Sequence, residues 1–439
     1  SSAASDVYKR QLYNRRPKKI KRNPEIFIEK RLENIISASN KGHKMVLKKY
    51  DMGLISVTAM GIGSVVGAGI FALLGEVILQ AGNLSYYAFI IAGIAAMFSG
   101  YSYAKLSGKY PDSGGLTDYF KIAFKSRAVS GTFTLIYYIT SFVSISMLAK
   151  SFGIYACKFL HDAAMEPLCV NYFASGIIIA LAILNMMGAD KVGNAETLMV
   201  AFKFFVLLSL IAGAFIELDV RSDKVDFMPT PTAFLGSIGI TFFAYAGYGI
   251  ITNAAADVKN PKFTIAAAIY LTIIIVALLY TSLAYIILKY IPEADLTANA
   301  DTAITIAAEK LFGKWGYGIM FAAAIIAFIS GISATYFSVF RISYALAEQK
   351  IMPKIYHKRF WEHGTYGNAL SVAVLTLATI YFDFNSIVNL ASGAYLVSYL
   401  AVFAASWVLR RETGASPVLI LLGSALMVFI LVMFLANIY

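Results

Sequence analysis

The sequence predicts an all-α polytopic membrane protein with about eleven transmembrane helices, of which the first and the sixth are broken. Hydrophobic residues make up 59% of its 439 residues and charged residues only 14%, which no soluble domain of this size requires. Many stretches of about 18 to 25 residues are almost free of charge, enough helix to cross a hydrocarbon core of about 30 Å. Two of these stretches contain glycine-rich interruptions.

Residues 1–50 are polar and strongly basic, with a cluster that includes Arg15, Arg16 and Lys18. We expect a cytoplasmic tail here rather than a specific site for anionic lipid or nucleic acid. Residues 1–11 show no hydrophobic periodicity and are set aside as a candidate cloning or assembly scar. The tail therefore contributes nothing to the predicted fold.

Eleven apolar runs are predicted to span the membrane, at 53–79, 84–108, 129–159, 172–189, 194–217, 232–254, 264–289, 316–347, 367–383, 386–409 and 416–437. The loops after every second span carry lysine or arginine, as at Lys121, Lys191 and Lys262. Because such residues stay on the cytoplasmic side, we expect a multi-pass protein of the cell membrane with a cytoplasmic N-terminus. One long external loop is expected to hold a short amphipathic helix at 301–312.

Catalytic and metal-binding residues are not gathered anywhere in the sequence. The four histidines are too scattered for a metal site, and Cys157 and Cys169 form no zinc framework. No nucleophile, base and orienting group share one segment. We therefore expect no enzyme, no metal and no cofactor. Whether the two cysteines pair with each other stays open.

The first interruption lies in Met60–Phe71, which reads MGIGSVVGAGIF. In a bilayer, unpaired backbone is tolerated only where it is buried in protein or lines a water-filled cavity. A helix that restarts there presents free N–H groups and the positive end of its dipole, which together bind an anion. We therefore predict that Gly67, Ala68 and Gly69 bind a substrate carboxylate.

The second interruption lies in Gly236–Asn253, which reads GSIGITFFAYAGYGIITN. Freed carbonyls at a helix end can accept hydrogen bonds from an ammonium group. The expected acceptors are the carbonyls of Phe243, Ala244 and Ala246, assisted by those of Val65 and Val66. Phe243, Tyr245 and Tyr248 are the expected aromatic neighbours of the substrate side chain. No acidic residue lies near either interruption, so a substrate with a second positive charge would lack a partner there.

The two broken spans are five spans apart, which indicates a five-plus-five inverted repeat. The predicted divisions are the tail at 1–50, a first repeat at 51–217, a second repeat at 218–409 and a peripheral eleventh span at 410–439. The alternative is that the small residues only allow close helix packing.

Four motifs resemble the amino acid, polyamine and organocation superfamily, and in particular prokaryotic proton-coupled transporters of the cationic amino acid transporter type. They are GIGSVVGAGIF at 61–71, YAKLSGKYPDSGG at 103–115, FAYAGYGIITNAA at 243–255 and VKNPK at 258–262. The resemblance implies the leucine-transporter-like fold. Three features depart from the family pattern: Lys105 and Ala256 replace usual acidic residues, and the usual twelfth span is absent, which suggests a shortened or incomplete chain.

Lys203 lies deep in the fifth predicted span, where an isolated ammonium group is costly. It must therefore be solvated by carbonyls, lose its proton during the cycle, or both. In the transporters that the sequence resembles, a matching lysine replaces a sodium ion between spans one and eight. That match implies bonds from Lys203 to the carbonyl of Gly63 and to the hydroxyl of Ser330 or Ser333. Lys150, Lys158 and Arg341 are instead expected to snorkel to the interfaces.

These features, with the family resemblance, predict a secondary transporter that imports amino acids by proton symport through alternating access, and the absence of acidic residues near the interruptions favours neutral amino acids. Its expected partners are an amino acid, protons and the lipid bilayer, without nucleic acid. An amino acid exchanger and a non-transporting amino acid sensor remain as alternatives, because one fold can serve several functions. The sequence does not indicate an oligomeric state.

Overall fold

The computed structural model describes residues 52–111, 115–160, 167–187, 192–216, 227–361 and 364–438. Within these ranges the chain is helical with no strand beyond one isolated bridge between Arg359 and Thr365. Each of the eleven predicted spans overlaps a described helix, although positions 188, 189 and 217 lie outside the described residues, and nine apolar helical stretches in the described part are long enough to cross a membrane. The prediction of an all-α polytopic membrane protein is confirmed. The basic tail at 1–50 lies outside the described residues.

The first five spans occupy six α-helices. They are α3 (Leu54–Ala68), α4 (Ile70–Ala81), α5 (Ser85–Lys109), α7 (Arg127–Leu160), α8 (Pro167–Met186) and α9 (Val192–Ile216). The first span is divided between α3 and α4, and a short 3₁₀ turn, η1 (Gly82–Leu84), leads from α4 into α5. The first predicted break is therefore present, although it occupies only Gly69 rather than Gly67–Gly69.

The remaining spans begin with α10 (Pro231–Ala244), which is followed by the 3₁₀ helix η2 (Tyr248–Asp257). The other long helices are α11 (Pro261–Tyr290), α13 (Ala303–Glu348), α14 (Tyr366–Tyr381), α15 (Phe384–Val408) and α17 (Pro417–Ile438). Shorter pieces connect them: α12 (Glu293–Asn299), η3 (Ala300–Thr302), η4 (Lys354–Tyr356) and α16 (Arg410–Thr413). The second predicted break is also present, and its second half is a 3₁₀ helix instead of an α-helix.

The eighth span agrees closely with its predicted range of 316–347, because α13 consists of two helical parts that meet at a kink at Gly313 and the second part ends at Glu348. The predicted short helix at 301–312 corresponds to the end of η3 and the first part of α13, which begins at Ala303, and only Gly313, with φ of 63°, has non-helical backbone between it and the long span. A positive φ of this kind is readily adopted by glycine, so the helix turns there without a loop.

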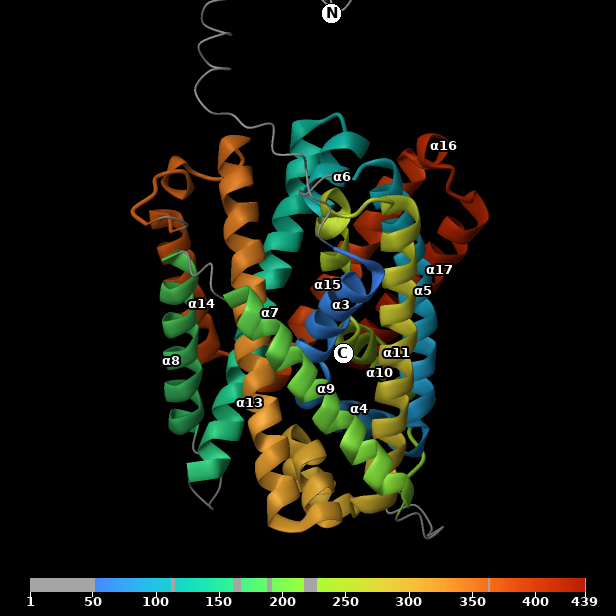
Figure 1. Cartoon of the computed structure of the whole chain (residues 1–439), viewed down its shortest axis with the longest axis vertical. Coiled ribbons are helices and arrows are strands. Elements are labelled where there is room, and N and C mark those ends of the chain that lie inside the picture. The colour runs from blue at the N-terminus through green and yellow to red at the C-terminus, as the bar shows by residue number, and fades with distance from the viewer. Residues whose placement is uncertain are drawn as a thin grey trace, which may run out of the picture. The chain divides into compact units, whose positions relative to one another are not determined.

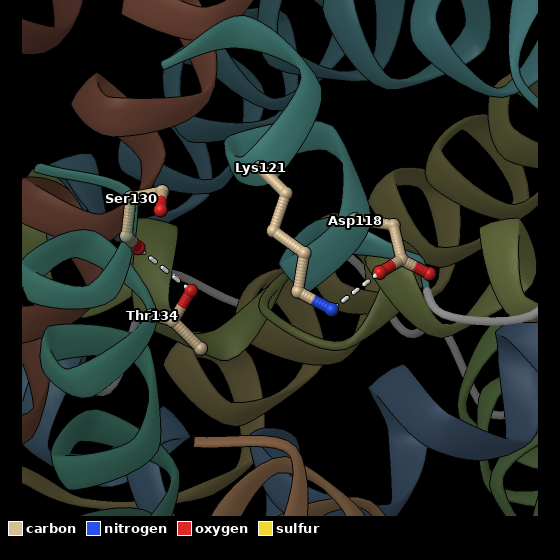
Figure 2. Close-up of polar contacts among 4 residues, drawn as sticks. All are labelled: Asp118, Lys121, Ser130 and Thr134. Carbon is tan, nitrogen blue, oxygen red and sulfur yellow. Dashed lines mark hydrogen bonds and ion pairs between the residues drawn. The ribbon is translucent and has the colours of Figure 1, made fainter. Parts of the chain in front are cut away.

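One amphipathic helix, α6 (Leu116–Ala123), was not predicted. It buries Tyr119 and Phe120 and packs against α7, where the rings of Phe120 and Phe133 lie 5.6 Å apart. On its more polar side, Lys121 Nζ forms an ion pair with Asp118 Oδ1 at 3.0 Å (Figure 2). Eight residues with this pattern are too few to resemble a span, which is why the hydropathy of the sequence did not reveal α6.

The broken helices lie inside the bundle, and α17 lies at its edge. Helix α3 contacts α9, α11 and α13, and α4 contacts α10 (Figure 1). Helix α17 packs on α10 at Gly236 and Gly239, where a Cβ atom would come within 2.6 Å of side-chain atoms of Asn437 and Phe434. Gly236 and Gly239 thus allow α17 to pack closely on one side of α10. Helix α10 also contacts α4, the second half of the first span.

Candidate functional site

The two helix interruptions meet inside the protein. Gly69 packs against the backbone of Ala244 so closely that a Cβ atom on Gly69 would lie 2.5 Å from the Ala244 carbonyl oxygen. One turn earlier, Ser64 Oγ donates a hydrogen bond to the carbonyl of Gly247 at 3.3 Å. The end of α3, the start of α4 and the break after α10 therefore form one junction.

The backbone at Gly69 changes little in direction. Its φ and ψ of −97° and −51° remain in the right-handed helical region, and its carbonyl accepts the first bond of α4 from Leu73 N at 2.9 Å. Gly67 and Ala68 are the last residues of α3. Because the first N–H groups of a helix lack acceptors within that helix, the candidate anion site centres on Gly69 and the beginning of α4.

The break in the sixth span is a three-residue turn between α10 and η2. Helix α10 begins with Pro231 and a Thr230 cap, whose Oγ1 accepts from Ala233 N at 3.2 Å. After Ala244 the chain turns through Tyr245, Ala246 and Gly247, and Gly247 has φ of +124°. That conformation strains any residue with a Cβ atom, so glycine is required at this position.

The predicted acceptors at this break have distinct surroundings. The Phe243 carbonyl accepts from Ala246 N at 2.8 Å, and the Ala244 carbonyl faces Gly69. Both Val65 and Val66 are buried at the end of α3. A carbonyl oxygen has two lone pairs, so one bond does not exhaust its capacity. The structure thus brings the carbonyls of both interruptions to one junction.

The three predicted aromatic neighbours point in two directions. The ring of Phe243 packs on Tyr395 of α15 with centroids 4.9 Å apart. Tyr245 and Tyr248 are buried, and both hydroxyls bond to α5: Tyr245 donates to the Phe89 carbonyl at 2.9 Å, and Tyr248 bonds with Ser99. Both hydroxyls thus have a partner on α5, and their oxygens can still accept a second hydrogen bond.

Tyr280 of α11 is a polar residue that the sequence did not single out. It is fully buried, and its hydroxyl donates to the Val65 carbonyl at 3.1 Å. No motif marks Tyr280, which stands in the apolar run LTIIIVALLYTSLAY. A lone tyrosine in such a run is indistinguishable from ordinary core packing before the helices are assembled.

Lys203 of α9 is fully buried, and its Nζ donates to the Gly63 carbonyl at 2.8 Å. Helix α13, which carries Ser330 and Ser333, packs against both α9 and α3. Both serines are buried, and Ser333 Oγ accepts from Asn185 Nδ2 of α8 at 3.1 Å. The carbonyl that Lys203 contacts thus lies on the same helix as the first interruption, less than two turns before Gly69.

The prediction that Lys150 snorkels to an interface is wrong. Lys150 is only 7% exposed, and its Nζ donates to Asn171 Oδ1 of α8 at 2.6 Å. The neighbouring helix supplies the acceptor that snorkelling would otherwise find in water. Lys158 also has protein acceptors, Asn299 Oδ1 at 3.1 Å and Thr302 Oγ1 at 2.9 Å. Arg341 is exposed, with its guanidinium over the ring of Phe337.

The pairing of the two cysteines, which the sequence left open, is present. Cys157 near the end of α7 and Cys169 near the start of α8 form a disulfide bond. The bond fastens the third and fourth spans to each other at one end.

Comparison with known proteins places this arrangement in a family. A model of the family described as amino acid permease matches residues 52–439. The chain is 37% identical to the inner membrane transport protein YbaT of Escherichia coli, over 88% of this chain and 90% of that protein. It is 23% identical to the branched-chain amino acid permease BcaP of Bacillus subtilis, over 77% of this chain and 75% of that protein.

A third relative is named for a substrate other than an amino acid. The methylthioribose transporter of Bacillus subtilis is 23% identical, over 88% of this chain and 86% of that protein. These relatives are transporters, as the sequence predicted, and the matched region includes every described span. The chain is a transporter and belongs to the amino acid permease family.

Proposed function

We propose that this transporter imports neutral amino acids across the cell membrane by proton symport. The observation that carries the proposal is the hydrogen bond from the buried Lys203 ammonium group to the Gly63 carbonyl, on the helix that ends at the first interruption. The bond supports a link between a titratable group and the candidate substrate site.

In the proposed site, the substrate carboxylate binds at Gly69 and the first N–H groups of α4. The ammonium group of the substrate binds carbonyls at the ends of α10 and α3, including those of Phe243, Ala244 and Val65. A zwitterion is then held between opposite helix ends by backbone dipoles alone. Neither interrupted segment carries a carboxylate that could neutralise a second positive charge, which supports a neutral substrate. The name of the branched-chain amino acid permease among the relatives agrees with this class.

The proposed proton carrier is Lys203. Burial disfavours a charged lysine, and acceptor atoms around it favour the charge, so its protonation depends on the arrangement of the helices near it. When protonated, it holds α3 to α9 through Gly63. When it releases its proton, the charge-assisted bond weakens and α3 is free to move with the substrate. Ser330 and Ser333 of α13 are the proposed hydroxyl partners that complete the lysine site.

The proposed orientation has the N-terminus in the cytoplasm. With an odd number of spans preceding it, the connection between α7 and α8 then lies outside the cell. The disulfide between Cys157 and Cys169 supports this orientation, because such bonds persist in oxidising compartments and are rare in the cytosol. The proposed repeats comprise spans one to five and six to ten, with α17 outside both.

Reconstitution into proteoliposomes distinguishes a proton symporter from an amino acid exchanger and from a non-transporting sensor. A thermal-shift screen of the common amino acids first identifies a ligand, since a compound that binds only the folded state raises its melting temperature. Proteoliposomes are then loaded at pH values that impose a gradient. Concentrative uptake of the ligand driven by that gradient is expected without sodium.

Other outcomes would assign other activities. A sodium requirement would contradict proton coupling. Counterflow without concentrative uptake would identify an exchanger, and stabilisation by the amino acid without any flux would identify a sensor.

A further inference from the structure

We propose that Tyr280 is a positioning residue of the substrate site, which holds the Val65 carbonyl where it can accept from the substrate ammonium group. The inference rests on the proposed function and adds a residue that lies outside the family motifs, since the nearest of them ends at Lys262, in the first turn of the same helix. Its basis is the hydrogen bond from the Tyr280 hydroxyl to Val65 and the position of Val65 at the end of a broken helix.

Val65 is one of the last four residues of α3, which ends at Ala68. The last four carbonyls of an α-helix have no N–H partner within that helix. A carbonyl without a partner is costly inside a membrane protein, where water does not replace the lost bond. The Tyr280 hydroxyl, 3.1 Å from the Val65 oxygen and fully buried, supplies one partner. The second lone pair of that oxygen remains for another donor.

Three consecutive residues of α3 are each bonded to a different element. Gly63 accepts from Lys203 of α9, Ser64 donates to Gly247 in the break of the sixth span, and Val65 accepts from Tyr280 of α11. A tyrosine hydroxyl stays protonated at physiological pH. The bond to Val65 therefore does not depend on proton delivery, whereas the bond to Gly63 depends on the charge of Lys203.

The ring of Tyr280 is held by residues that belong to the same junction. Its centroid lies 5.4 Å from that of Tyr245, in the break of the sixth span, and 5.8 Å from that of Phe89. The Tyr245 hydroxyl in turn donates to the Phe89 carbonyl. Tyr280 thus contacts both interruptions, through its hydroxyl at Val65 and through its ring at Tyr245. Packing on both sides restricts the direction of the hydroxyl.

A purely structural hydrogen bond is the alternative, and the chain offers a matched control. Tyr336 of α13 is also fully buried, and its hydroxyl donates to the Ile178 carbonyl of α8 at 3.2 Å. Ile178 lies within α8 (Pro167–Met186) and away from either interruption. Tyr336→Phe therefore removes the same chemical group and the same kind of bond without touching the junction.

The test compares Tyr280→Phe and Tyr336→Phe in the full chain. For the amino acid found by thermal shift, ligand affinity is measured from the dose dependence of the melting temperature, and KM and Vmax are measured in proteoliposomes over a range of pH. Tyr280→Phe is expected to weaken affinity and raise KM about three- to tenfold, the usual net effect of one hydrogen bond. The pH midpoint of uptake should stay unchanged. Tyr336→Phe is expected to lower only the melting temperature of the unliganded protein.

Equal changes of affinity in the two variants would overturn the inference, because the bond to Val65 would then be structural only. A shifted pH midpoint with unchanged affinity would overturn it too, since it would make Tyr280 part of proton coupling. The affinity measurement does not depend on flux. If the wild-type chain binds an amino acid but does not move it with protons, the proposed function fails while the comparison of the two variants still decides the role of Tyr280.

Discussion

The ammonium group of Lys203 donates to the carbonyl oxygen of Gly63 across 2.8 Å and so joins α9 to α3. Gly63 lies six residues before Gly69, the point at which the first span is interrupted and contacts Ala244. A change in the charge of one side chain can therefore act on the helix end that forms half of the candidate substrate site.

Substitution of Lys203 by methionine is expected to abolish the proton dependence of uptake. Methionine is similar in length and apolar, but it can neither ionise nor donate to Gly63. Loss of a charge-assisted bond is worth about 1.5–3 kcal/mol, so proton-driven uptake should fall about tenfold or more. Counterflow of the substrate should persist. The measurement is uptake into proteoliposomes with and without a pH gradient.

Lys150→Met is the matched control for that variant, because Lys150 is a second buried lysine with a side-chain acceptor on another helix, Asn171. Its loss should lower the melting temperature and leave the proton dependence intact. Unchanged proton-driven uptake in Lys203→Met, or the same loss in both variants, would refute the assignment of Lys203.

The contact between Gly69 and Ala244 predicts that Gly69→Ala is severely disruptive. The new methyl group would lie 2.5 Å from a backbone oxygen, which cannot rotate away as a side chain can. Overpacking of this kind costs about 1–3 kcal/mol, and here it would separate the two interruptions. We expect a lower melting temperature and loss of stabilisation by amino acids in a thermal-shift assay.

Gly176→Ala in α8 tests whether any glycine of a span is equally sensitive. A Cβ atom on Gly176 would meet no atom within 4 Å, and alanine is the better helix former by about 1 kcal/mol. This variant should match or exceed the wild type in stability and bind ligand normally. Normal ligand binding by Gly69→Ala would show that the junction is not the substrate site.

The disulfide between Cys157 and Cys169 predicts which side of the membrane its helix ends occupy. In intact cells, a membrane-impermeant reductant followed by an impermeant maleimide should label Cys169, which is partly exposed, more readily than Cys157, which is only 4% exposed. Without reduction, neither should react. A Cys157→Ser and Cys169→Ser double variant provides the background signal. Labelling that requires inside-out vesicles would reverse the proposed orientation.

The positions of the spans and their interruptions were predictable because they depend on local sequence. An apolar run must be long enough to cross the bilayer whatever its neighbours are. Glycine at 69 and 247 marks the breaks because backbone without a Cβ atom can approach Ala244 at the first and adopt φ of +124° at the second. The width of the first break was overestimated, since Gly67 and Ala68 are compatible with helix and continue α3.

Most contacts between segments far apart in the sequence could not be predicted from local sequence patterns. Lys203 and Gly63 are 140 positions apart, and the expectation that they bond came from the family resemblance rather than from spacing. Asn171 as the acceptor for Lys150 was missed, because the sequence shows that a lysine is buried in a span but not which helix lies beside it. The bonds from the hydroxyls of Tyr245 and Tyr248 to α5 were not predicted for the same reason.

The sequence by itself determined that this chain is a helical membrane protein with two interrupted spans and a lysine too deep to reach water. Composition and residue type suffice for these features, because the bilayer imposes the same demand on every span. Only the tertiary structure decided that Gly69 meets Ala244, that Cys157 pairs with Cys169 and that Tyr280 holds Val65. The Tyr280 contact joins residues 215 positions apart, and a hydrogen bond of this kind depends on how two helices are turned toward each other, which no local pattern encodes.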